Sequence, residues 1–224
     1  MKHRFSHTFF WILGLVLIAS CLTVPVSDPE TIGECLLLGG FAPVLWPAGS
    51  SNMGGYKGRV AFIPESAVSK VPALPESPSE AADYVTAAGS FTFIKSGDKP
   101  TPIYATRATV SYKADIQGET DCKSYKITGE FFHPGNGIEA AAFARQICNT
   151  PGYLLIENND HQLLIGQDGL PCTVSASFDG GKAPADKRGY SFTFEADSES
   201  PMIVMGTPID IAALMSGAAG AASE

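Results

Sequence analysis

The strongest constraint on the fold is a strict alternation of apolar and polar residues in the middle of the chain. In residues 109–117 every second side chain is apolar, namely Val110, Tyr112, Ala114 and Ile116. Successive side chains of a β-strand point to opposite faces, so this period of two predicts a strand buried on one face. Residues 118–122 interrupt the pattern with polar residues, and residues 123–132 resume it. The two stretches together predict a long β-hairpin.

Other segments show the same extended character. Residues 153–157 and 162–166 are apolar runs on either side of Asn158-Asn159-Asp160-His161, which predicts a second hairpin. Residues 64–80 contain four prolines and predict a long exposed loop. Further strands are predicted at residues 59–63, 90–95, 172–178, 190–195 and 201–206.

One helix is predicted between these strands. Residues 138–148 are rich in alanine, the best helix former, and Asn136 with Glu139 three residues later is typical of a capping box. An apolar face at helical spacing comprises Ala140, Phe143, Ala144 and Ile147, and we expect Phe143 to anchor it on a sheet. Residues 209–215 predict one further turn of helix, followed by a flexible tail at residues 216–224.

Composition supports this interpretation. Hydrophobic residues make up 45% of the chain and charged residues only 17%, which excludes a disordered protein, and 23 Gly with 16 Pro favour many turns. The predicted fold is therefore mainly β, a two-sheet sandwich or barrel of about eight strands with one flanking α-helix. A formal net charge of -8 argues against a surface that grips nucleic acid, because such surfaces concentrate Lys and Arg.

The N-terminus allows two interpretations. Residues 1–4 are basic and residues 9–19 are apolar, which is the layout of a secretory signal, and Ile18-Ala19-Ser20-Cys21 resembles a bacterial lipobox in which Cys21 is lipidated. Alternatively, translation starts at Met53, directly before a predicted strand. We therefore divide the chain into a signal-like leader at 1–52, a β-sandwich domain at 53–206, and a short helix with a tail at 207–224.

The sequence predicts no catalytic, cofactor-binding or metal-binding residues. No nucleophile, phosphate-loop, dinucleotide or zinc-protease motif occurs. Cys148 with His133 or His161 is a weak candidate for a nucleophile and its base. The acidic residues of the second hairpin region, Glu157, Asp160 and Asp168, are better explained as turn residues than as cation ligands.

The cysteines do not define a compartment. If Cys21 is lipidated, an even set of four remains (Cys35, Cys122, Cys148 and Cys172), whereas a start at Met53 leaves three. No Cys-x-x-Cys pair is present. Free thiols, buried or half-buried, are the simpler expectation.

The order of elements over residues 109–206 resembles the phage tail tube family and its relatives in contractile injection machines. The resemblance rests on the long hairpin, the helix, Gly152-Tyr-Leu-Leu-Ile-Glu157, Gln162-Leu-Leu-Ile-Gly166, a Gly-Gly-Lys loop and Arg188-Gly-Tyr-Ser-Phe-Thr-Phe-Glu195. It covers roughly 100 residues and includes no catalytic group.

This resemblance implies a non-enzymatic structural subunit of a phage or prophage tail, made in the bacterial cytoplasm and located in the virion. Such subunits associate into rings, commonly of six, and the rings stack into a tube that contacts other tail proteins. DNA would pass through an acidic lumen without specific binding. The alternative is an exported surface lipoprotein, anchored to the membrane through Cys21, whose β-sandwich binds a ligand or partner.

Overall fold

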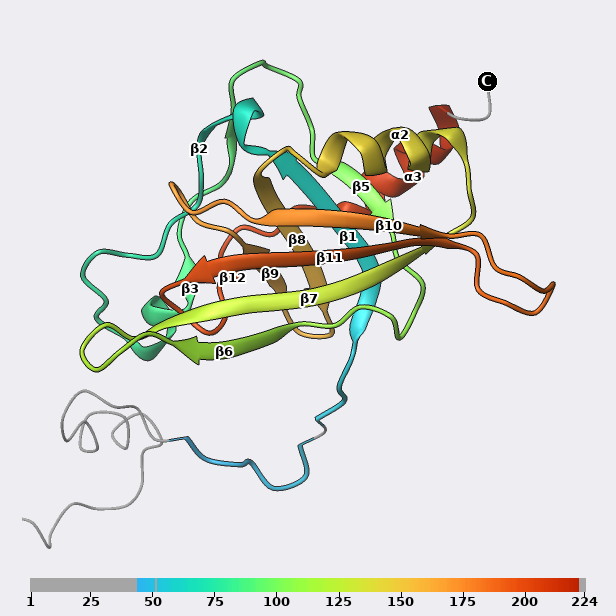
Figure 1. Ribbon diagram of the computed structural model, residues 1–224. Coiled ribbons are helices and arrows are strands. Elements are labelled where there is room, and N and C mark those ends of the chain that lie inside the picture. The colour runs from blue at the N-terminus through green and yellow to red at the C-terminus, as the bar shows by residue number, and fades with distance from the viewer. Residues whose placement is uncertain (1–43, 51, 222–224) are drawn as a thin grey trace, which may run out of the picture. The chain divides into compact units, whose positions relative to one another are not determined.

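A computed structural model describes residues 44–50 and 52–221, and the described residues from Gly49 onward form one compact unit. With 41% strand and 14% helix the protein is mainly β, as the alternating pattern predicts. In residues 44–50 and 52–221, three sheets are accompanied by the helices α2 (Ile138–Ile147) and α3 (Ile211–Ala221). Figure 1 shows the strands of one large sheet running across those of the other, so that the two sheets form the layers of a sandwich.

The larger sheet has six strands and is antiparallel except at one edge. Its strand order is β3 (Thr86–Ala87), β12 (Val204–Met205), β9 (Gln162–Ile165), β8 (Gly152–Asn158), β1 (Tyr56–Pro64) and β5 (Thr101–Tyr104). Only the β3–β12 pair is parallel. The predicted hairpin around residues 158–161 is confirmed, with Glu157 opposite Gln162.

The second sheet has four strands, all antiparallel. Its order is β10 (Thr173–Asp179), β11 (Gly189–Ser198), β7 (Ser124–Pro134) and β6 (Lys113–Gln117). The long β6–β7 hairpin predicted from the alternation is confirmed. A small third sheet pairs β2 (Val68–Lys70) with β4 (Thr92–Phe93), and the 3-10 turns η1 (Glu65–Ala67) and η2 (Ala81–Tyr84) lie in the same part of the chain.

The six-stranded sheet is buried on both faces, which explains the continuous apolar runs of its central strands. On one face, Val60, Phe62, Leu154 and Ile156 pack against the four-stranded sheet and α2. On the other face, Ala61, Ile63, Tyr153 and Leu155 pack against the chain around β4, β12 and the start of α3.

Aromatic side chains join the helix to both sheets. The Phe131 and Phe192 rings of the four-stranded sheet stack with centroids 5.0 Å apart. Phe143 of α2 meets Phe192 at 5.8 Å and Phe62 of the six-stranded sheet at 6.2 Å, both in edge-to-face geometry. This confirms Phe143 as the anchor of the helix.

Some local predictions are wrong. Gly137, not Asn136, is the N-cap of α2, and no side chain caps the helix, because the Asn136 amide oxygen accepts a hydrogen bond from Arg188 instead. The strand predicted from residue 109 begins at Lys113, and the loop predicted at 64–80 contains η1 and β2. Helix α3 continues to Ala221, so most of the predicted flexible tail is helical.

Candidate functional site

The free edges of the four-stranded sheet are the first candidate surface. Within the described part of the chain, each of the edge strands β6 and β10 has a partner strand on one side only, and neither contains proline. The six-stranded sheet ends differently: β3 is two residues long, and β5 contains Pro102, which has no N–H to donate. Short strands and prolines are common ways of blocking an edge. The four-stranded sheet thus ends in the longer edge strands, and α2 packs beside one of them, β10.

The exposed face of the same sheet is polar. The register places one set of side chains on this face, with Phe132 as its aromatic exception: Lys113, Asp115, Gln117, Ser124, Lys126, Thr128, Glu130, Thr173, Ser175, Ser177, Asp179, Ser191, Thr193, Glu195 and Asp197. Five of them are carboxylates and two are lysines. The lysines form ion pairs within the face, Lys113 with Asp115 at 2.7 Å and Lys126 with Glu195 at 3.1 Å. The remaining carboxylates make the face acidic.

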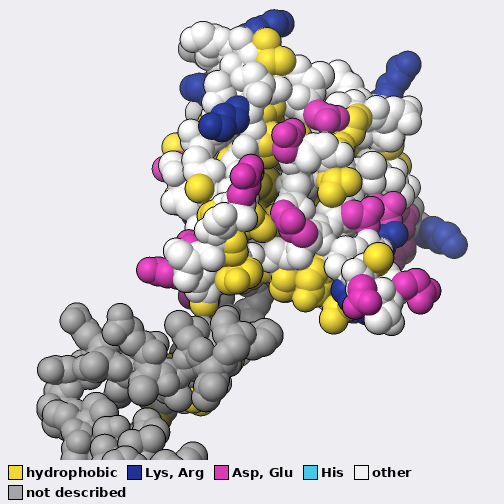
Figure 2. Space-filling view, turned by 90° about the vertical axis from the view of Figure 1, so that its left-hand side faces the viewer, with side chains coloured by type: hydrophobic (Ala, Val, Ile, Leu, Met, Phe, Trp, Pro, Cys, Tyr) yellow, Lys and Arg dark blue, Asp and Glu magenta, His cyan; other side chains and the backbone are white. Residues whose placement is uncertain are grey.

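The β6–β7 hairpin extends beyond the core and ends in a narrow acidic turn. Ile116 lies on the core-facing side of β6, yet 67% of it is exposed. Gly118 and Asp121 adopt positive φ angles of 92° and 65°, which shape the turn. Lys123 Nζ donates to the Gly118 carbonyl oxygen at 2.6 Å and closes it. Acidic side chains are spread over the end of the molecule seen in Figure 2, with apolar side chains between them.

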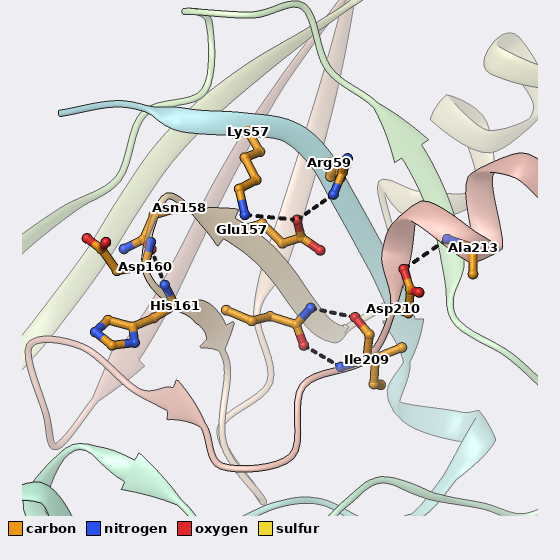
Figure 3. A network of polar contacts seen from close by, with 10 residues as sticks. Lys57, Arg59, Glu157, Asn158, Asp160, His161, Ile209, Asp210 and Ala213 are labelled. Carbon is orange, nitrogen blue, oxygen red and sulfur yellow. Dashed lines mark hydrogen bonds and ion pairs between the residues drawn. The ribbon is translucent and has the colours of Figure 1, made fainter. Parts of the chain in front are cut away.

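A polar groove lies on the far face of the six-stranded sheet (Figure 3). Lys57 and Arg59, two residues apart on β1, point to the same side, and both contact the Glu157 carboxylate of neighbouring β8, at 3.9 and 3.3 Å. The groove has a volume of about 520 Å³ and also borders Asp160, His161 and Asp210. The Glu157 side chain is only 13% exposed, so its charge is balanced by these two cations within the groove.

Hydrogen bonds hold the walls of this polar groove in place. The buried Gln162 amide donates to the Ile209 carbonyl oxygen and accepts from the Ile209 N–H, both at 2.8 Å. This pair of bonds fixes the chain that enters α3. At the start of the helix, the Asp210 carboxylate accepts from the Ala213 N–H at 3.0 Å, and Asn158 accepts from the Asp160 N–H at 2.8 Å in the β8–β9 turn (Figure 3).

A second hollow of about 460 Å³ adjoins the groove and shares Lys57 and Arg59 with it. Its remaining walls include Arg107, Tyr56, Tyr104, Asn159 and the two methionines Met53 and Met215. No carboxylate lines it. Burial raises the pKa of the Tyr56 phenol, so this hydroxyl stays protonated at neutral pH.

The structure separates the residues of the weak nucleophile candidate. The Cys148 thiol donates to the Ala144 carbonyl oxygen at 3.1 Å, which is a contact within its own helix turn. The His133 ring contacts the Tyr104 carbonyl oxygen at 2.9 Å, and His161 lies in the polar groove. Within residues 44–50 and 52–221, no group of three His, Cys, Asp or Glu is placed to hold a metal ion.

The other sequence predictions have mixed outcomes. Asp160 lies in the predicted turn, but Glu157, interpreted as a turn residue, instead uses its carboxylate to bind Lys57 and Arg59. Among the described cysteines, Cys172 is a buried free thiol as expected, whereas the free thiols Cys122 and Cys148 are exposed. Cys21 and Cys35 lie outside the described residues. In the part of the chain that is described, no helix is long and apolar enough to cross a membrane.

The cations of the groove and the hollow, Lys57, Arg59 and Arg107, were not among the site residues predicted from the sequence. Their signal is the spacing Lys57-Gly58-Arg59 at the start of a strand, which places both cations on one face. Arg107 joins them only through the fold.

Comparison with known proteins gives no assignment: no protein family model, no curated protein and no solved structure matches the chain.

Proposed function

We propose that this protein is a structural subunit of a phage or prophage tail, and that copies associate into a ring by pairing β6 of one copy with β10 of the next. The observation that carries the proposal is the contrast between sheet edges. The six-stranded sheet ends in a two-residue strand and a proline-containing strand, while the four-stranded sheet ends in β6 and β10, which have no outer partner strand among the described residues. Free edges are an aggregation hazard unless an assembly uses them.

Strand direction is compatible with this closure. The four strands alternate in direction from β10 to β6, so β6 and β10 run in opposite directions. When a rotated second copy places its β10 beside β6, the new pair is again antiparallel. The contact is heterologous, because different surfaces of the two copies meet, and such contacts generate rings when the rotation closes.

Strand spacing gives the size of the ring. Neighbouring strands lie about 4.8 Å apart. In a ring of six copies, the number that the family resemblance implies, four strands from each copy give about 24 strands and a circumference of about 115 Å. The corresponding backbone diameter is about 37 Å for strands without tilt. Tilt of the strands would widen it.

The polar face of the four-stranded sheet would line the lumen. Its carboxylates Asp115, Glu130, Asp179, Glu195 and Asp197 exceed the lysines on the face by three. A surface of net negative charge repels phosphates, so DNA could move along it without sticking. The apolar faces of the same strands are already used in the core of the subunit.

Electron microscopy of the purified full-length chain, and of a chain that begins at Met53, tests the proposal. We expect rings or tubes at high protein concentration. A protein that remains monomeric at every concentration, in both preparations, contradicts the proposed function.

Two proline variants test the edge itself. Neighbouring backbone N–H groups point to opposite sides of a strand, so of Ser175 and Ala176 one donates toward β11 and the other points to the outer edge of β10. Proline at the first of these positions removes a hydrogen bond to β11, whereas proline at the second removes only a donor at the outer edge. The variant that keeps its circular dichroism spectrum and melting temperature is expected to lose rings. Normal rings from that variant would exclude β10 pairing.

A further inference from the structure

The hollow bordered by Lys57, Arg59 and Arg107, here the cationic hollow, has three cations and no carboxylate among the described residues that line it. Lys57 and Arg59 share the single carboxylate of Glu157. Arg107 is exposed and makes no ion pair within the described part of the chain. Glu157, Asp160 and Asp210 border the adjoining polar groove beside Lys57 and Arg59. The positive charge left without a nearby carboxylate in the space of about 460 Å³ is therefore that of Arg107, on a chain whose formal net charge is -8. Such a site favours an anionic occupant.

The same chain also has an acidic projection, whose charge is opposite to that of the hollow. The turn at residues 118–122, here the acidic finger, exposes Glu119 and Asp121, and neither side chain forms an ion pair within the described residues. Its backbone is held by the Lys123 contact to Gly118 and by the Cys122 N–H, which donates to the Glu119 carbonyl oxygen at 3.1 Å. The finger is therefore preformed, which lowers the entropy cost of docking it.

The finger and the hollow lie at opposite ends of the four-stranded sheet. The finger precedes Ser124, the first residue of β7. The hollow adjoins the other end of β7: the Thr106 N–H donates to the Phe132 carbonyl oxygen, and the Ala105 N–H donates to Gly58. Eight residues of extended chain separate Ser124 from Phe132, which is about 26 Å. A finger cannot reach the hollow of its own copy, but it can meet the hollow of a second copy placed end to end.

We propose that the acidic finger of one copy docks in the cationic hollow of the next copy along the strand direction. This inference rests on the proposed function and deepens it: β6–β10 pairing closes the ring, and the finger joins one ring to the next. Glu119 and Asp121 meet Arg107 and Lys57, and the exposed Ile116 at the base of the finger is covered on docking. Salt weakens the contact between rings, because the charges are solvent-exposed before docking.

Charge reversal with rescue tests this contact on the full chain. Arg107→Glu and Glu119→Lys each replace an attraction by a repulsion, and each is expected to raise the concentration needed for stacking by about fivefold or more. Rings themselves persist in both variants. The combined variant with both Arg107→Glu and Glu119→Lys again places opposite charges at the contact, and it is expected to form tubes. Lys182→Glu, in the exposed loop after β10, is the matched control and leaves stacking unchanged.

Sedimentation velocity and electron microscopy count rings and tubes separately, and circular dichroism confirms that each variant is folded. If the single variants stack like the wild type, or if the combined variant fails to recover, the finger-to-hollow contact is excluded while ring formation stands. Wild-type rings that never stack also exclude this contact alone. Monomers under all conditions contradict both proposals.

Discussion

Replacing Phe192 by alanine tests whether the aromatic junction between the sheets and α2 carries the stability of the subunit. Phe192 is 1% exposed and contacts the rings of Phe131, Phe143 and Tyr190 at centroid distances of 5.0, 5.8 and 6.2 Å. Truncation of a buried phenylalanine costs about 3 to 5 kcal/mol, because transfer free energy is lost and a cavity remains. We expect the upper half of this range, since three ring contacts disappear together.

Urea unfolding followed by far-ultraviolet circular dichroism measures the loss, at protein concentrations where the midpoint does not depend on concentration. The slope of the transition should stay constant while the midpoint falls. Phe178→Ala is the matched control: this side chain is 50% exposed and contacts Tyr190 at 4.9 Å, so its loss should cost less than about 1.5 kcal/mol. A loss below about 1 kcal/mol for Phe192→Ala would refute the proposed role of the junction.

Further predictions follow from individual side chains. Gly129→Ala should lower the free energy of unfolding by about 1 to 3 kcal/mol in urea titration, because the new methyl group would clash with the Ser111 carbonyl oxygen and the Phe194 ring. Burial raises the pKa of the Cys172 thiol to about 12, so a thiol reagent should modify it only upon unfolding, whereas exposed Cys122 reacts in the native protein. Backbone N–H groups lower the pKa of Asp83; its stabilising contribution is therefore present above about pH 4 and lost below it. Thermal melts should show a smaller acid-induced loss for the Asp83→Ala variant than for the wild type.

Strands with a long alternating pattern were predictable, because burial of one face of a strand makes every second residue apolar. Strands β6, β7, β10 and β11 follow it, and the pairs β6–β7 and β10–β11 join neighbours in sequence, whereas β7 and β11 pair across α2, β8, β9 and β10. The two-residue strands β3 and β4 pair with β12 and β2. The strand predicted at residues 90–95 includes β4, whereas no local signal marks β3.

Long-range contacts also explain the errors in the helices. Asn136 is a residue type that commonly caps helices, but its side-chain oxygen accepts a hydrogen bond from Arg188, 52 residues away. The predicted turn of helix covers residues 209–215, and the segment from Ser216 onward has the composition of a flexible tail. Helix α3 instead runs from Ile211 to Ala221, and its start is held in place because Gln162 fixes the backbone of Ile209 and Ile211 is completely buried.

The candidate surfaces were only partly predictable. The polar face of the four-stranded sheet follows from alternation alone, since Glu195 and Asp197 must point away from the core if Phe194 and Ala196 point into it. The cationic hollow was not predictable, because Arg107 joins Lys57 and Arg59 through the crossing of the chain between the two sheets.

Cryo-electron microscopy of the assembled full-length protein would show whether copies of this chain close into a ring through the edges of the four-stranded sheet. We expect a closed ring with a continuous antiparallel sheet around the lumen, in which β6 of each copy pairs with β10 of its neighbour and the face that carries Glu130 and Glu195 lines the channel. An assembly in which both edges remain unpaired, or in which this face is turned outward, would exclude the proposed ring.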